Sequence, residues 1–259
     1  MSDAYDSGLT VQGSGEAVVL VSGMDGTGKL FYRQVPSLAR SYRVATYALR
    51  DTATTMEELV ADLGRIVDTV APEARRATIV GESFGGALAL SFALARPAQV
   101  ERLVILNSFP CFTPQIRLHL ALFALRTIPW GAMALVRRLT ASRLHSRHTH
   151  RAEIRRFLEL TASASRDGYC NRLRVLTHYD VRHRLQDIRV PTLFLASDRD
   201  HLVPSVAQAH YMAARVPGAT VRVLDGHGHI CLIAPDVDLA DILEAWQLAP
   251  PKRGEGGRR

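Results

Sequence analysis

The most restrictive feature of the sequence is a series of six short apolar runs spread along the chain. They are AVVLVS (17–22), VATYAL (44–49), ATIVGE (77–82), LVILNS (103–108), TLFLAS (192–197) and VRVLDG (221–226). The middle four are nearly continuous in apolar residues, which is typical of strands covered on both faces. Helical patterns lie between them, one of them opened by Thr54 and Glu57 as an expected capping box. This alternation predicts an α/β fold with a mostly parallel central sheet and helices on both faces.

One long segment interrupts the alternation. Residues 109–184 contain no clear strand, and the gap is too long for a simple connection. The segment opens with an apolar helical stretch interrupted by Pro129 and continues as a polar, basic helical region. We therefore expect a core of residues 1–108 and 185–248, an inserted helical cap of residues 109–184, and a disordered basic tail of residues 249–259.

The bulk composition excludes several classes of protein. With 47% hydrophobic and 22% charged residues the chain is expected to be globular. No apolar run approaches the roughly 18 residues of a membrane span, and the N-terminus lacks the pattern of a signal peptide. We therefore expect a cytoplasmic protein without a transmembrane segment. The three cysteines show no CxxC spacing, so they indicate neither a disulfide framework nor a zinc site.

The positive charge is concentrated in one part of the chain. Between residues 115 and 184 there are 14 arginines, no lysine and four acidic residues, while the whole chain carries a net charge of +7. Such a block suits an acidic or phosphate-bearing partner, although a solvated arginine-rich face has the same composition. Aromatic residues are not interleaved with the arginines, which argues against a nucleic-acid partner.

The phrase GESFGG (81–86) follows one apolar run and precedes a helical pattern. A serine hydroxyl is a weak nucleophile that needs a neighbouring base, together with donors for the oxyanion that forms after attack. Small residues on both sides allow a sharp turn between strand and helix that presents Ser83 at the carboxyl edge of the sheet. The backbone N–H of Phe84, at the start of the helix, can point at the oxyanion.

An acid and a histidine should follow the serine in that order. The apolar run 192–197 is followed by Asp198 and Asp200, and the run 221–226 is followed by His227 and His229. Both loops are expected at the same edge of the sheet as Ser83. Spacing alone leaves two candidates for each role.

With these fragments the chain resembles the α/β-hydrolase superfamily. The resemblance rests on VSGMDGTG, GESFGG, SDRDHLVP and GHGHI, in the correct order, and extends from about residue 17 to residue 246. In relatives the acid lies in a D-x-L-V-P-like stretch, which selects Asp200. The histidine closes a G-x-G-H phrase, which selects His229. Some relatives carry the acid where this chain has Asn107, but an amide cannot serve.

The resemblance also implies a second oxyanion donor in the loop after an early strand, commonly HG-x. Here that loop reads Ser22-Gly23-Met24, a departure at the first position, and the backbone N–H of Met24 is the candidate. The glycine-rich phrase GMDGTG lacks both the GxGxxG spacing and the P-loop lysine, so phosphate binding is not predicted.

These residues predict a serine hydrolase that cleaves a carboxylic ester or thioester through a Ser83–His229–Asp200 triad and an acyl-enzyme, without a cofactor or metal. The cluster His145, His148 and His150 has no carboxylate or cysteine companion, so a solvated loop is expected there.

The substrate class is less constrained. Apolar cap residues can pack the cap onto the core or line a pocket for a small or medium acyl chain; they are Leu118, Leu120, Leu122, Phe123, Leu125, Trp130, Met133 and Leu135. Together with the basic cap surface, a pocket would suit an acyl group on an acidic carrier such as CoA or acyl carrier protein.

Three other functions remain open. The first is acyl transfer to an alcohol, because the phrases GMDGTG and GESFGG are similar to those in the hydrolase-like half of plastid phytyl ester synthases. The second is perhydrolysis like that of cofactor-free haloperoxidases, and the third is ligand binding by a receptor on a hydrolase scaffold. Dehalogenation is disfavoured because that branch has an aspartate at the position of Ser83.

Overall fold

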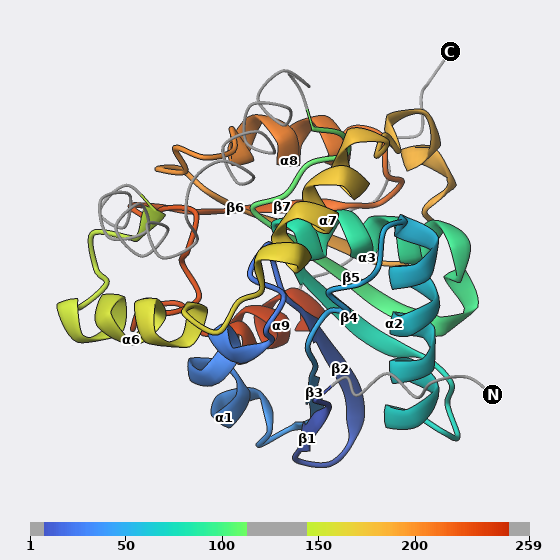
Figure 1. The fold of residues 1–259 in the computed structure, drawn as a ribbon. Coiled ribbons are helices and arrows are strands. Elements are labelled where there is room, and N and C mark those ends of the chain that lie inside the picture. Colours follow the sequence, from blue (N-terminus) through green and yellow to red (C-terminus); the bar gives the residue numbers. More distant parts are fainter. Residues whose placement is uncertain (1–7, 113–143, 249–259) are drawn as a thin grey trace.

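The computed structural model describes residues 8–112 and 144–248. Within them, seven strands form one sheet in the order β1-β3-β2-β4-β5-β6-β7 (Figure 1). Strand β1 pairs with β3 in antiparallel fashion, and the other pairs are parallel. The strands are β1 (Thr10–Gln12), β2 (Glu16–Val21), β3 (Tyr42–Thr46), β4 (Ala77–Glu82), β5 (Val100–Leu106), β6 (Thr192–Ser197) and β7 (Thr220–Leu224). The predicted fold class, an α/β protein built on a mostly parallel sheet, is confirmed.

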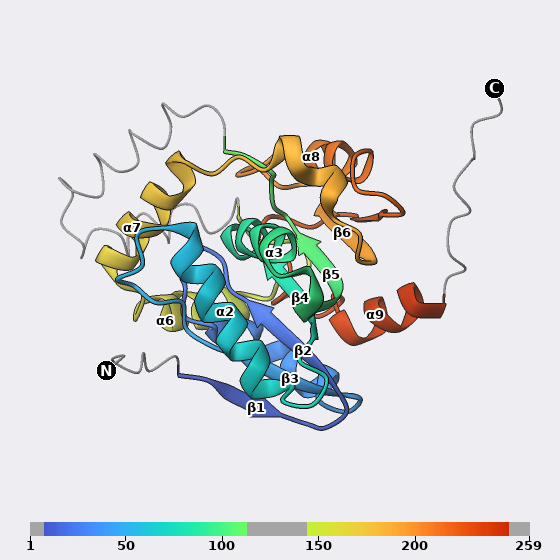
Figure 2. The same ribbon diagram turned by 90° about the vertical axis from the view of Figure 1, so that its right-hand side faces the viewer.

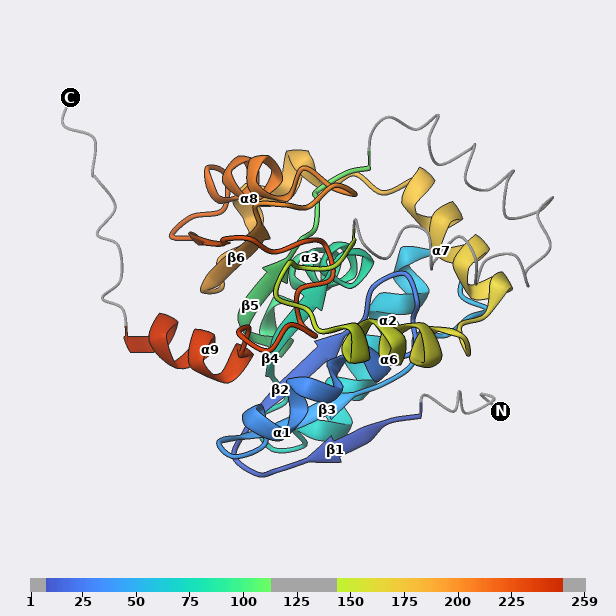
Figure 3. The same ribbon diagram turned by 90° about the vertical axis from the view of Figure 1, so that its left-hand side faces the viewer.

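Helices cover both faces of the sheet because both faces of the inner strands are apolar. In β2, Val19 and Val21 enter the core beneath one helical layer, whereas Val18 and Leu20 enter the core beneath the other. The first layer contains α2 (Met56–Val70), α3 (Phe84–Ala95) and α8 (Ser205–Ala213). The second contains α1 (Val35–Leu38) and α9 (Leu239–Leu248). Figure 2 shows the α2 and α3 side, and Figure 3 shows the opposite side with α1 and α9.

The N-terminal cap of α2 lies one residue later than the sequence predicts. Glu58 donates its backbone N–H to the Thr55 hydroxyl at 3.3 Å, and its carboxylate accepts the backbone N–H of Thr55 at 3.2 Å. The predicted pairing of Thr54 with Glu57 is therefore wrong. Two adjacent threonines precede two adjacent glutamates, so the sequence offers the same spacing in both registers, and the helix uses the second.

Helices dominate the described part of the segment between β5 and β6. It contains α6 (Arg151–Thr161), α7 (Arg166–Thr177) and the 3-10 turn η4 (Arg182–Asp187). Its two ends lie together, because Cys111 and Asp180 form an isolated antiparallel β-bridge and the Val181 backbone N–H donates to the Pro110 carbonyl at 2.9 Å. This closure suits an insertion, although the cap boundaries at 109 and 184 remain a prediction.

The apolar stretch of the predicted cap, including its candidate pocket residues, falls in residues 113–143 and so lies outside the described residues, as does the predicted tail 249–259.

Two further 3-10 turns are η1 (Lys29–Arg33), which α6 contacts, and η2 (Pro97–Gln99). In the described ranges, no helix is both long enough and apolar enough to cross a lipid bilayer.

Candidate active site

The site is organised around the turn that joins β4 to α3. Ser83 stands between them with φ of 54° and ψ of −116°, in a region that non-glycine residues seldom occupy. The glycines on either side permit this bend. A Cβ on Gly85 would lie 2.1 Å from the Val21 carbonyl oxygen, and one on Gly81 would lie 2.3 Å from the Gly85 oxygen. Residue 83 is thus held in a strained turn that only small neighbours allow.

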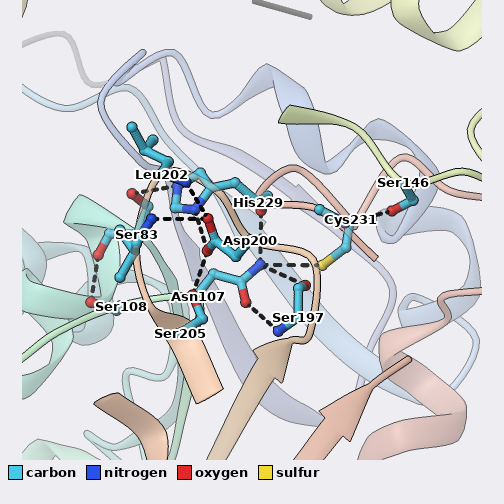
Figure 4. A network of polar contacts seen from close by, with 12 residues as sticks. Ser83, Asn107, Ser108, Ser146, Ser197, Asp200, Leu202, Ser205, His229 and Cys231 are labelled. Carbon is cyan, nitrogen blue, oxygen red and sulfur yellow. Dashed lines mark hydrogen bonds and ion pairs between the residues drawn. The ribbon is translucent and has the colours of Figure 1, made fainter. Parts of the chain in front are cut away.

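Three predicted side chains meet at this turn. The Ser83 hydroxyl lies 3.0 Å from Nε2 of His229, and Nδ1 of His229 lies 2.7 Å from Oδ2 of Asp200 (Figure 4). A carboxylate can only accept a hydrogen bond, so Nδ1 carries the imidazole proton and Nε2 is free to accept from the serine. This is the geometry that a serine nucleophile needs for activation.

The Asp200 carboxylate is fully enclosed and accepts several hydrogen bonds. Its Oδ1 accepts the backbone N–H groups of Leu202 and Val203 at 2.9 and 3.0 Å, and its Oδ2 accepts from the Ser205 hydroxyl as well as from His229. Burial by itself raises the pKa of Asp200, but the hydrogen bonds from His229, Ser205 and Val203 outweigh it and hold that pKa below its ordinary value. Asp200 is therefore an anion that can orient the imidazole at neutral pH.

The two competing candidates make other contacts. Asp198 accepts the backbone N–H of Gly226 at 2.7 Å and so joins the turns after β6 and β7. His227 is buried, with Nδ1 at 2.7 Å from the Ser146 hydroxyl. In the described part of the chain, the hydroxyl of Ser83 bonds to His229 and to neither of these two side chains.

Asn107 supports the histidine loop in a way that the sequence did not reveal. It follows β5 with a left-handed φ of 48° and is buried. Its amide donates to the backbone carbonyl of His229 at 2.8 Å and to the Ser197 hydroxyl at 2.9 Å, while its oxygen accepts the Ser197 backbone N–H at 2.8 Å (Figure 4). The signal in the sequence was a polar residue at the end of a buried strand.

The two predicted oxyanion donors belong to segments beside Ser83. Phe84 is the first residue of α3, and the first amides of a helix have no partner within it. Met24 follows Gly23, at which an added Cβ would lie 3.4 Å from the Ser83 Cβ. The loop after β2 therefore packs directly against residue 83, although the first position of that loop is Ser22 instead of histidine.

The predicted solvated histidine loop is only partly correct. His145 is buried, and its ring stacks edge-on against Phe157 with centroids 4.8 Å apart. Burial lowers the pKa of His145 to about 4, so this ring is neutral at physiological pH. His148 and His150 are exposed, as expected. In the part of the chain that the structure covers, no group of three or more histidine, cysteine or acidic side chains is arranged to hold a metal ion.

Two buried titratable groups lie close to the site. Burial, reinforced by the charges of Asp25 and Asp200, raises the pKa of Glu82 to about 7 despite the opposing effect of His229. Burial also raises the pKa of the Cys231 thiol to about 12, so this cysteine is not a competing nucleophile at neutral pH.

A serine on a strained strand–helix turn, facing a histidine and an aspartate from later loops of a parallel sheet, defines an α/β-fold hydrolase. Comparison with known proteins agrees with this class. The chain belongs to the alpha/beta hydrolase family, whose sequence model matches residues 18–242.

Individual relatives extend over most of the chain. A protein of Xanthomonas campestris named pimeloyl-[acyl-carrier protein] methyl ester esterase is 30% identical over 258 residues, which cover 94% of this chain and 99% of that protein. A Caulobacter protein named as a carbamate hydrolase, RutD, is 28% identical over 242 residues, covering 88% and 89%. The structure of an enol-lactonase from Burkholderia xenovorans shares the fold with a TM-score of 0.81 at 21% identity, covering 93% and 96%.

Proposed function

We propose that this hydrolase cleaves a carboxylic ester or thioester by way of an acyl-enzyme formed on Ser83. The observation that carries the proposal is the unbroken hydrogen-bonded series from the Ser83 hydroxyl through His229 to Asp200. The relatives described above support it, because their names describe hydrolases and, in one case, an esterase. The same names favour an enzyme over a ligand receptor.

In the first half of the reaction, Nε2 of His229 accepts the Ser83 proton while Oγ attacks the carbonyl carbon of the substrate. Negative charge develops on the carbonyl oxygen, where the backbone N–H groups of Met24 and Phe84 can bind it. Asp200 stabilises the imidazolium and keeps its proton on Nδ1. When the tetrahedral intermediate collapses, His229 donates its Nε2 proton to the leaving alcohol or thiol, and the acyl group stays on Ser83.

In the second half, water takes the place of the leaving group. His229 accepts a proton from the water molecule, whose oxygen attacks the acyl carbon, and the same donors bind the second oxyanion. Collapse returns the proton from His229 to Ser83 and releases a carboxylic acid. Apart from the substrate and one water molecule, the cycle uses only groups of the chain itself, and it leaves the enzyme unchanged.

The test combines covalent labelling with turnover. A fluorophosphonate should label the wild type with one equivalent at Ser83, and a panel of nitrophenyl esters and acyl-thioesters should be hydrolysed. Ser83→Ala should abolish labelling and lower kcat by about 10⁴-fold or more. Ser91→Ala is a matched control, because Ser91 lies on α3 and its hydroxyl donates only to the Ala87 carbonyl at 3.0 Å. Equal turnover by wild type and Ser83→Ala would refute the proposal.

An acyl group on an acidic carrier is the substrate form that the charge distribution favours. Arg147, Arg151 and Arg155 are exposed at the start of α6 and in the turn before it. A relative whose name specifies an acyl-carrier ester supports the same idea. Exposed charges act on a partner through a field that salt screens over about 10 Å at 0.1 M.

We therefore expect carrier-bound esters to be hydrolysed with a lower KM than the matching free methyl esters, and the advantage to shrink with added salt. The double variant Arg151→Glu with Arg155→Glu should remove the advantage while leaving free-ester hydrolysis intact. Equal rates for both forms at all salt concentrations would exclude a carrier.

A further inference from the structure

A buried arginine from the inserted segment reaches the loop that follows β2. Arg172 lies on α7, and its side chain is 1% exposed. Its Nε–H donates to the Met24 carbonyl at 2.9 Å, one terminal nitrogen contacts the Asp51 carboxylate at 3.0 Å, and the other lies 3.3 Å from the Asp25 carbonyl. A guanidinium buried in this way needs partners for its donors, and two of these three are backbone carbonyls of the GMDGTG phrase.

The glycines around this contact leave room for the guanidinium. Gly26 has a left-handed φ of 68°, and a Cβ there would lie 2.5 Å from a terminal nitrogen of Arg172. On the other side, a Cβ at Gly168 would lie 1.9 Å from Oδ1 of Asp51. The glycine-rich phrase thus has a structural role that does not involve phosphate, because its backbone carbonyls accept hydrogen bonds from the Arg172 side chain of α7.

The same loop borders the nucleophile. The Gly26 backbone N–H donates to the Gly23 carbonyl at 3.1 Å, which makes Met24 and Asp25 the central residues of a turn. The Gly26 carbonyl in turn accepts the Leu49 backbone N–H at 2.7 Å. Arg172 holds the carbonyls of both central residues, so it restrains the turn from which the Met24 N–H projects.

The loop has little other side-chain support at its start. The Ser22 hydroxyl, at the position where relatives commonly carry histidine, is buried and finds no hydrogen-bond partner among the described residues. The turn is closed by backbone bonds, by Arg172 and, from within the loop, by the Asp25 carboxylate, which accepts the Thr27 backbone N–H at 2.9 Å. Displacement of a catalytic donor by about 1 Å can cost about 100-fold in rate, so the restraint on this turn matters for chemistry.

We propose that Arg172 is a positioning residue for the oxyanion hole, through which the inserted segment sets the direction of the Met24 backbone N–H. The inference rests on the proposed serine-hydrolase function and adds to it that the site is complete only when α7 is docked. Because the Met24 N–H is required chiefly in the transition state, loss of Arg172 should lower kcat and leave KM little changed.

The experiment compares Arg172→Met and Arg172→Lys with the wild type, using the best ester of the panel. Active-site titration with a fluorophosphonate corrects each preparation for its fraction of folded enzyme. Arg172→Met should lower kcat by about 10- to 100-fold, and Arg172→Lys should recover part of the loss. A trifluoromethyl ketone, which binds as a tetrahedral oxyanion, should lose affinity in proportion to kcat/KM across the series. Arg174→Met is the matched control, because Arg174 lies on the exposed face of α7 and bonds to the Asn171 side chain.

The outcomes separate the two proposals. A wild type that neither labels at Ser83 nor turns over an ester refutes the serine-hydrolase function itself. An active wild type together with an Arg172→Met variant of unchanged kcat, whatever its Tm, refutes the positioning role.

Where Arg172→Met does not fold, Asp51→Ala gives the answer, since its carboxylate is 45% exposed and its removal only loosens the guanidinium. A lower kcat with unchanged KM in Asp51→Ala supports the role, and wild-type kinetics overturn it.

Discussion

Asp200→Asn should nearly abolish turnover while leaving the fold in place. Oδ1 of residue 200 accepts two backbone N–H groups, so the oxygen of the new amide is held there and its NH₂ group faces His229. A donor at that position cannot accept the Nδ1 proton, so the imidazole carries its proton on Nε2 instead and cannot take the proton of Ser83. An equivalent change of tautomer in serine proteases lowers kcat by about 10⁴-fold, which corresponds to about 5.5 kcal/mol in the activation free energy.

The assay is initial-rate hydrolysis of the best ester, with circular dichroism to confirm folding. Asp198→Asn is the control, because it makes the same chemical change two residues away. Its new amide oxygen can still accept the Gly226 N–H that Asp198 accepts now at 2.7 Å. We expect Asp198→Asn to keep wild-type kcat. The reasoning is refuted if both variants lose activity equally, or if Asp200→Asn retains more than about a tenth of it.

Three further predictions concern stability. The pKa of Glu82 is raised from 4.5 to about 7, so between these pH values Glu82 holds a proton in the folded state that it has released in the unfolded chain, and the contribution of Glu82 to stability falls as pH rises through the window. Glutamine does not titrate, so the free energy of unfolding of Glu82→Gln, measured by urea unfolding, should rise relative to that of the wild type by about 3 kcal/mol from pH 4.5 to pH 8. Parallel pH profiles of the two proteins would contradict this. Asn107→Asp places a carboxylate 2.8 Å from the His229 carbonyl and should cost about 1–3 kcal/mol in the same assay, whereas unchanged stability would show that the amide donor is dispensable. Gly85→Ala brings a methyl group to 2.1 Å from the Val21 carbonyl and should cost about 3 kcal/mol, visible as a lower Tm; a wild-type Tm would mean that the turn can widen.

The sequence was most informative where its signals are local and strong. Continuous apolar runs predicted β4 and β6 with their observed bounds. Both faces of these strands are buried, so few polar residues interrupt the apolar run between the two ends of each strand. Strand β1 was missed, since its three residues are exposed and carry no apolar pattern. The capping box of α2 was misplaced by one residue because adjacent threonines and glutamates made both registers equivalent.

Contacts between distant segments could not be predicted in this way. His145 was assigned to a solvated loop, yet it is buried against Phe157, and nothing near it in the sequence signals that packing. Arg172 was one of 14 arginines in a basic segment, and the chain separates it from Met24 by 148 residues. Composition predicts a charged face for such residues, whereas tertiary structure decides which one of them is buried.

The strand order explains why the candidate site needs support from a strand that contributes no reacting group. Strand β4 ends next to Ser83 and its neighbour β2 leads into the loop of Met24, so these two parts of the candidate site are adjacent in the strand order. Asp200 follows β6, which is separated from β4 by β5, a distance of about 10 Å across the sheet. The imidazole of His229 must therefore extend over the end of β5, and the residue found there is Asn107, whose amide holds the His229 carbonyl and the last residue of β6 together. A shorter or apolar side chain at that position would leave the His229 carbonyl without the donor that Asn107 supplies.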